Sequence, residues 1–104
     1  MIIVTTETVM GKKVEEVFGV AKGEVVMSKH VGSDFMAGLK TVVGGEIKGY
    51  TDMMRKARAV AIERMTEDAK KMGANAIVGM RLGSSTIMGG ASEMYAYGTA
   101  VKVK

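Results

Sequence analysis

The stretch Tyr50–Met72, YTDMMRKARAVAIERMTEDAKKM, decides how this chain folds. Apolar side chains recur in it at three- and four-residue steps, and charged side chains fill the other positions, a pattern typical of an amphipathic helix. Lys70 and Lys71 suit the negative end of the helix dipole, and Gly73 suits the left-handed position that ends a helix. At 1.5 Å per residue we expect a helix roughly 35 Å long, enough to cross a small sheet. The apolar positions are Tyr50, Met53, Met54, Ala57, Ala61, Met65, Ala69 and Met72.

The segments around this helix have the composition of β-strands. Ala74–Ser85 and Met94–Val103 are predominantly apolar and flank the glycine-containing turn Met88–Ser92, which predicts an antiparallel hairpin. Ile2–Thr6 is short and β-branched, and Val14–Met27 alternates along much of its length, so both are predicted as strands.

One face of the Val14–Met27 strand is expected to be buried and shallow. Its odd positions run from Val17 through Gly19, Ala21 and Gly23 to Met27, and all of them are apolar or small. Because a glycine inside a strand often marks the close approach of another backbone, we expect the long helix to cross here, at Gly19 and Gly23.

A second, shorter helix is predicted over Ser33–Val43, with Ser33 as its N-cap and Gly44-Gly45 as its end. The expected fold class is therefore α+β. A small antiparallel or mixed sheet is packed by one long and one short helix, and residues 1–104 form a single domain.

Composition excludes several classes of function. The chain has 104 residues with a formal charge of +4, one His and no Cys, which removes disulfides and thiolate sites and favours a cytoplasmic location. No apolar run approaches the ~18 residues of a membrane span, and no secretory leader is present. Cations are scattered among few aromatic residues, so nucleic-acid binding is not expected.

No catalytic constellation is found, so we do not expect an enzyme. Gly44–Thr51 resembles a phosphate-binding loop, but Tyr50 stands where the loop lysine belongs. Glu63 and Glu67 form a like-charge pair on a polar helix side, where a general acid or base lacks a dry cleft. The methionines are interpreted mainly as core filler rather than as soft-metal ligands.

A metal site is one hypothesis for the remaining polar residues. His30 and Asp34 combine an imidazole with a carboxylate, and Glu46 is a third candidate ligand for a divalent or soft metal ion. A single chain supplies an incomplete coordination shell, which several copies around an axis would complete. The alternative is that His30 is an ordinary surface histidine near a turn.

Self-association follows from the last two predicted strands, which are apolar on both faces. Two helices on one side of a small sheet leave the other side bare. A bare apolar face of that size exceeds what soluble monomers usually expose, and closed symmetry is the usual remedy. We therefore expect a homo-oligomer.

Five motifs together resemble the YbjQ-like family of small prokaryotic proteins, over essentially the whole chain. They are Gly44–Ile47, Tyr50-Thr51, Ala57-Arg58, Gly73–Gly79 and Gly98–Lys102. The resemblance implies a dodecin-subunit-like fold, a ring-shaped homo-oligomer that is a pentamer, and the family's heavy-metal-binding label. The expected function is thus binding of a heavy metal or small ligand at subunit interfaces; the alternative is a structural or interaction module with no metal role.

Overall fold

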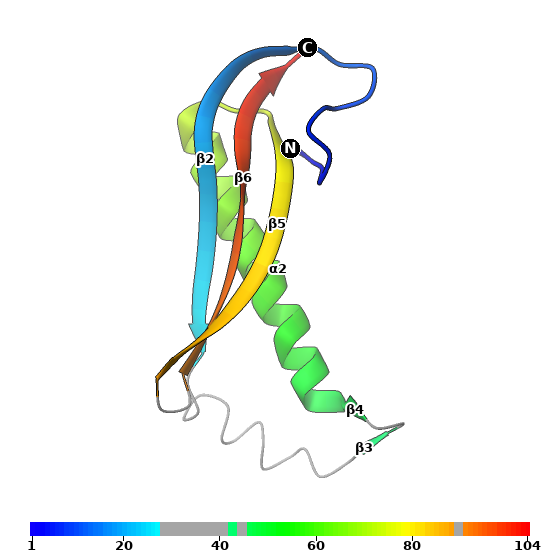
Figure 1. Cartoon of the computed structure of the whole chain (residues 1–104), viewed down its shortest axis with the longest axis vertical. Helices are drawn as coiled ribbons and strands as arrows, with labels where there is room; N and C mark the ends of the chain where they lie inside the picture. The colour runs from blue at the N-terminus through cyan, green and yellow to red at the C-terminus, as the bar shows by residue number, and fades with distance from the viewer. Residues whose placement is uncertain (28–41, 44–45, 89–90) are drawn as a thin grey trace.

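The computed structural model, which describes residues 1–27, 42–43, 46–88 and 91–104, packs one long helix across one face of a four-stranded sheet (Figure 1). The helix is α2, Lys48–Met72. The sheet order is β1-β5-β6-β2, with β5 paired antiparallel to β6, β6 antiparallel to β2, and β1 parallel to β5. The strands are β1 (Ile2–Ile3), β2 (Val14–Met27), β5 (Ala76–Met88) and β6 (Ala91–Val103).

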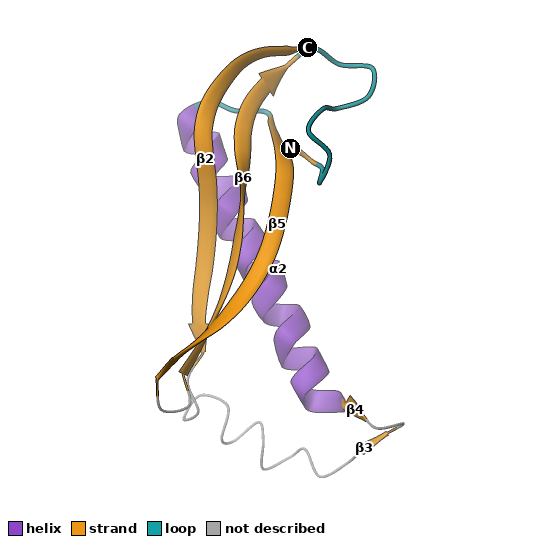
Figure 2. Cartoon of the chain, viewed as in Figure 1, coloured by secondary structure: helices purple, strands orange, loops and turns teal. Residues whose placement is uncertain are grey.

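Most of the predicted elements are confirmed. The long helix begins two residues before the predicted Tyr50 and ends at Met72, and β2 has the predicted bounds. The hairpin of the last two strands is antiparallel as expected, and the two-layer arrangement of helix and sheet is evident in Figure 2. The N-terminal strand is shorter than predicted, although its contact with β5 continues beyond Ile3: the Val4 nitrogen donates to the Ile77 oxygen, and the Thr6 oxygen accepts from the Gly79 nitrogen.

The prediction of a short helix over Ser33–Val43 is wrong at its C-terminal end, and residues 33–41 lie outside the described part. Val42–Val43 form β3, which pairs antiparallel with β4, Glu46–Ile47, just before α2. Two β-branched residues lose side-chain freedom in a helix, and the Gly-Gly pair that follows them favours a tight hairpin.

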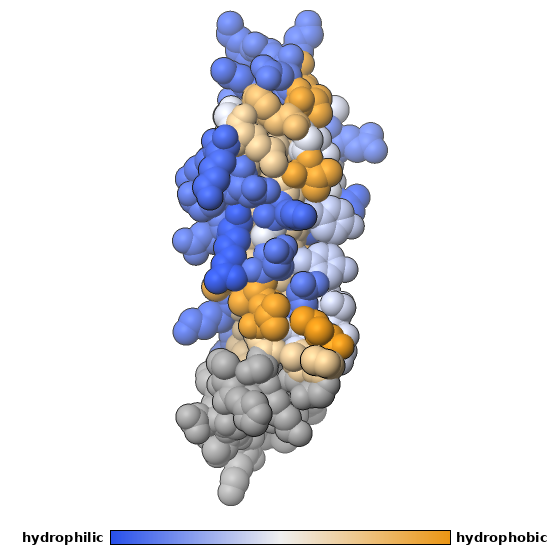
Figure 3. All heavy atoms as spheres, turned by 90° about the vertical axis from the view of Figure 1, so that its left-hand side faces the viewer, coloured by the Kyte–Doolittle hydropathy of each residue, from blue (hydrophilic) through white to orange (hydrophobic). Residues whose placement is uncertain are grey.

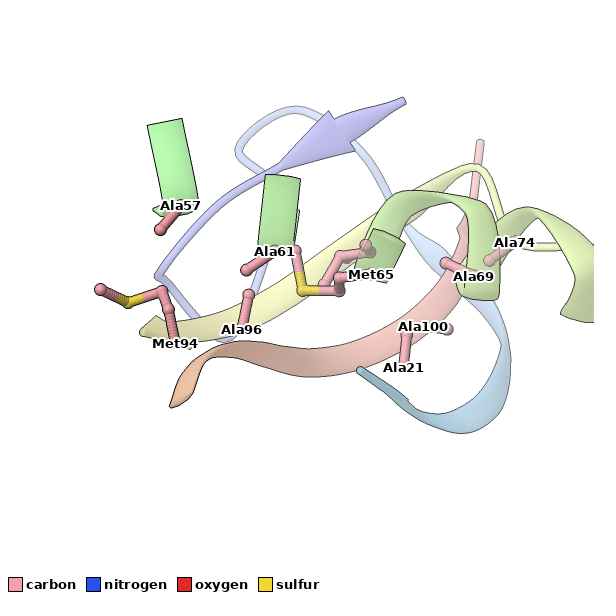
Figure 4. Close-up of a cluster of buried hydrophobic side chains, with 10 residues drawn as sticks. Ala21, Ala57, Ala61, Met65, Ala69, Ala74, Met94, Ala96 and Ala100 are labelled. Atoms are coloured by element: carbon pink, nitrogen blue, oxygen red, sulfur yellow. The ribbon is translucent and has the colours of Figure 1, made fainter. Parts of the chain in front are cut away.

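The main core lies between α2 and the sheet and is built largely of alanine (Figure 4). Because alanine side chains are short, the helix backbone sits close to the strands, and Met65 fills the largest gap with no exposed surface. The buried members are Ala21, Ala57, Ala61, Met65, Ala69, Ala74, Ile77, Met94, Ala96 and Ala100.

Gly23 is where the helix crosses β2, as the sequence predicted. A Cβ atom at this position would collide with the backbone of α2, at the Ala61 oxygen, the Met65 nitrogen and the Arg64 carbonyl carbon. Only glycine therefore permits this distance between strand and helix.

Gly19 has a different role from the one predicted. A Cβ atom there would have no neighbour within 4 Å, but its φ of +122° suits glycine and accompanies a register shift between Val17 and Gly19. The bulge reverses the alternation of β2 on the N-terminal side of Gly19. Val17, predicted to be buried, is consequently 64% exposed, and Phe18 packs against the core instead.

A second, smaller core covers one end of the opposite sheet face, and the sequence did not predict it. Ile2, Val4 and Val9, from the N-terminal segment (residues 1–13), pack over a cluster from β5 and β6. The chain therefore clothes part of this face itself. The clothed residues are Ala76, Val78, Val101 and Val103.

The turn after α2 is held by paired hydrogen bonds. The side chain of Asn75 donates from Nδ2 to the Val103 oxygen at 2.9 Å, and its Oδ1 accepts from the Val103 nitrogen at 2.8 Å. Gly73, at a φ of +94°, reverses the chain after the helix. Asn75 thus joins the start of β5 to the end of β6.

Replacing Gly23 with Val should lower the free energy of unfolding by about 1–3 kcal/mol, because the side chain forces α2 away from β2. Urea denaturation at fixed protein concentration measures this. Glu15→Val, at an exposed position of the same strand, is the matched control and should change stability by less than about 0.5 kcal/mol. Equal stability of the Gly23 variant and the native chain would show that the helix does not rest there.

Replacing Asn75 with Ala should cost about 1–3 kcal/mol, because both backbone groups of Val103 lose their partner. The same denaturation measurement applies, with Lys102→Ala on exposed β6 surface as the control. If hydrogen exchange of the Val103 amide were unchanged in the Asn75 variant, the clamp would be refuted.

Candidate self-association and ligand surface

The sheet face that α2 does not cover, called the outer face here, carries the unusual surface of this molecule. Because side chains alternate between the two faces of a strand, the β2 residues that do not face α2 lie on the outer face. Their cross-strand partners on β6, and the β5 partners of those, lie on the same face. Below the end clothed by the N-terminal segment, these residues are Val17, Val20, Lys22, Glu24, Val26, Arg81, Gly83, Ser85, Glu93, Tyr95, Tyr97 and Thr99.

Large apolar side chains on the outer face are exposed to solvent. Val17, Val20 and Val26 expose 64%, 63% and 56% of their surface, and Tyr97 exposes 43%. Figure 3, which views the molecule from its β2 side, shows hydrophobic side chains interrupted by charged ones along its length. Branched valines gain most when packed against a second layer, so a strip of exposed ones indicates a surface made to be covered.

Two tyrosines form a flat floor at the centre of this face. The rings of Tyr95 and Tyr97 are stacked, with centroids 6.1 Å apart and planes inclined by 25°. Gly83 lies opposite Tyr95 in the register, and a Cβ atom there would run into the Tyr95 ring. The missing side chain at Gly83 therefore lets the Tyr95 ring lie across β5.

Charges of both signs border the tyrosines. Lys22 on β2 and Arg81 on β5 stand on either side of Tyr97 in the register, whereas Glu24 is opposite Tyr95. Farther along, the Ser85 hydroxyl lies 3.4 Å from a carboxylate oxygen of Glu93. A surface with an apolar centre and both charges is suited to contact another copy of itself.

Two backbone groups on the β2 edge of the sheet, by contrast, are bonded by side chains of α2. The backbone nitrogen of Lys22 donates to Asp68 Oδ2 at 3.0 Å, and Arg64 Nη1 donates to the Glu24 oxygen at 2.7 Å. These are outward-facing groups of edge strand β2, the kind that another strand would pair with. At these two positions the β2 edge is therefore already hydrogen-bonded within the chain.

The structure leaves the predicted metal ligands untested. His30 and Asp34 lie outside the described residues, and Glu46 is in β4, paired with Val43, with only its backbone described. Among the described residues, no three His, Asp or Glu side chains are grouped so that they could hold a metal ion.

Methionine is core filler at the most buried positions. Met65 and Met94 both belong to the main core. Met10 and Met88 are exposed.

Across the described ranges, no helix is long and apolar enough to cross a membrane.

The sequence missed the grouping of Lys22, Tyr97 and Arg81, since it depends on the register of three strands. It also missed the covering of one sheet end by the N-terminal segment. A signal for that covering was present in the sequence. Ile2, Val4 and Val9 are apolar, and apolar residues spread along a terminal segment favour its packing against another part of the chain.

Comparison with known proteins places the whole chain in one group. The model of the family YbjQ_1, described as "Putative heavy-metal-binding", matches residues 1–104. A UPF0145 protein of Thermotoga maritima is 59% identical over 104 residues, covering 100% of this chain and 98% of that protein. A UPF0145 protein of Vibrio campbellii is 57% identical over 103 residues, covering 99% of each.

A solved structure supports the fold at greater distance. A Pediococcus pentosaceus protein, described as of unknown function and belonging to the DUF74 family, superposes with a TM-score of 0.61. The match covers 100% of this chain and 98% of that one at 14% identity, so it concerns the fold alone.

Proposed function

This chain belongs to the YbjQ_1 family, and on that premise we propose that it is a self-assembling, non-enzymatic protein that binds a metal ion or small ligand between its copies. The proposed assembly is a closed ring of dodecin-subunit-like protomers, a pentamer, located in the cytoplasm. The partner is a second copy of the same chain.

The observation that carries the proposal is the exposed apolar strip of the outer face. Val17, Val20 and Val26 lie on one strand and Tyr97 on its neighbour, and α2 lies on the other side of the sheet. Removing such apolar surface from water contributes about 25 cal/mol for each Å² buried, which favours association. The N-terminal segment covers only one end of the face, which leaves this strip for another protomer.

The proposed mode of contact between copies follows from the hydrogen bonds that α2 already makes to the β2 edge. Asp68 and Arg64 occupy the edge groups of β2, so a protomer that docks on the outer face meets less resistance than one that extends the sheet. Lys22 and Glu24 on that face allow charges of one copy to meet opposite charges of the next.

Metal binding would require more than one protomer. In the proposed site, His30, Asp34 or Glu46 from several copies complete the coordination shell. Neutral imidazole and carboxylate suit a divalent ion. The alternative is a structural or interaction module in which the ring itself is the functional object.

The variant Val20→Glu should convert the assembly to single chains of 11.0 kDa, because docking on the outer face would bury an unpaired carboxylate. Sedimentation velocity at micromolar concentration measures the mass. Ala59→Glu, on exposed surface of α2, is the matched control and should remain assembled. A native chain that sediments as a monomer would refute the assembly.

Titration of chelator-stripped protein with Zn²⁺, Ni²⁺ and Cu²⁺ tests the metal hypothesis. We expect saturable heat for at least one ion, with fewer ions than chains because copies share each site. Affinity should fall as the pH is lowered, because protons compete with the metal ion for an imidazole ligand.

His30→Ala should abolish that heat, and Asp52→Asn, an exposed acid of α2, should leave it unchanged. If no ion gives saturable heat in the assembled protein, the metal role is wrong and the structural module is favoured.

A further inference from the structure

The outer face contains a hollow of about 530 Å³ between the N-terminal segment and β2. Its floor is apolar and aromatic, with Val17, Val101 and Tyr97 contributing side chains. Two charged residues also line it, Arg81 on β5 and Glu7 in the N-terminal segment. The volume is within the range of small-molecule sites, which are mostly apolar with a few placed polar groups.

The Arg81 side chain is held in place by hydrogen bonds to two backbone carbonyls. Its Nη1 atom donates to the Met80 oxygen at 2.8 Å and to the Thr5 oxygen at 3.1 Å, so the guanidinium is tied to both β5 and the N-terminal segment. Neutral carbonyls leave its charge uncompensated, and in the described part of the chain the guanidinium forms no ion pair. A positioned arginine without a carboxylate partner is prepared to bind an anion.

We propose that this hollow binds a small organic carboxylate with an aromatic or branched aliphatic body. The carboxylate pairs with the Arg81 guanidinium through its remaining N–H groups, and the body lies on the Tyr97 ring and against the Val17 and Val101 side chains. Glu7, which also lines the hollow, repels anions, and because this repulsion is larger for a dianion, a monoanion is favoured over a phosphate dianion.

This inference deepens the proposed function and rests on it for one feature, the closure of the site. A protomer docked on Val20 and Val26 would lie next to the open side of the hollow and reduce its contact with water. The anchor and the floor come from a single chain, so binding to Arg81 does not itself require assembly.

The test is titration of the ¹⁵N-labelled full chain with 3-phenylpropionate, followed by amide chemical shifts. We expect saturable shifts at Gly79, Thr99 and Val101, which border the hollow. The neutral analogue 3-phenylpropanol and the dianion phenyl phosphate should each bind at least tenfold more weakly. Absence of saturable shifts at these amides, or tighter binding of either analogue, would overturn the proposal.

Variants locate the anchor. Arg81→Gln should weaken 3-phenylpropionate at least tenfold, whereas Arg64→Gln, an arginine tied to the β2 edge, should bind as the native chain does. If Arg81→Gln does not fold, Arg81→Lys decides, because it keeps the charge, loses the two-pronged geometry and should bind several-fold more weakly. Undiminished binding by a folded Arg81 variant would refute the assignment.

Sedimentation of the same samples separates this inference from the proposed function. A native chain that is monomeric yet binds 3-phenylpropionate supports the hollow and refutes the assembly. An assembled chain that gives no saturable shifts refutes the hollow and leaves the assembly standing.

Discussion

The close contact between α2 and the strands β2 and β6 is the constraint on which the rest of this structure depends. Gly23 has no room for a Cβ atom because the helix backbone passes directly over it, and the facing positions on helix and sheet are mainly alanine. Short side chains make a thin core, so one helix seals one sheet face tightly. The same arrangement leaves the outer face without a helix. The exposed apolar residues on that face are the basis of the proposed function.

The chain covers its second face only in part. The N-terminal segment buries one end of it through Ile2, Val4 and Val9, while Val20 and Val26 remain exposed farther along β2. The edge of that strand is already bonded by Asp68 and Arg64 from α2. In the proposed assembly, contact on the outer face would bury side chains without displacing these two hydrogen bonds.

Several of the motifs that carried the family resemblance have structural roles. Gly73 reverses the chain after α2, Asn75 clamps the end of β6, and Gly79 has a positive φ of 63° next to a shift in the β5–β6 register. A Cβ atom at Gly98 would collide with Ile77. These four residues therefore act on the fold of this chain. The candidate chemistry instead lies on side chains such as Arg81 and Tyr97, whose grouping depends on that fold.

The sequence by itself determined the elements with strong local signals. The spacing of apolar residues defined α2 nearly to the residue, alternation defined β2, and the glycine at position 23 indicated where the helix would cross. Tertiary structure decided the bulge at Gly19 that exposes Val17, the β3–β4 pair in place of a helix end, and the cover supplied by residues 1–13. It also decided that Arg81, Tyr97 and Lys22 stand in one row. The physical reason is that periodicity and propensity act between near neighbours in the chain, whereas register, bulges and cross-strand neighbours are fixed only when distant strands pair.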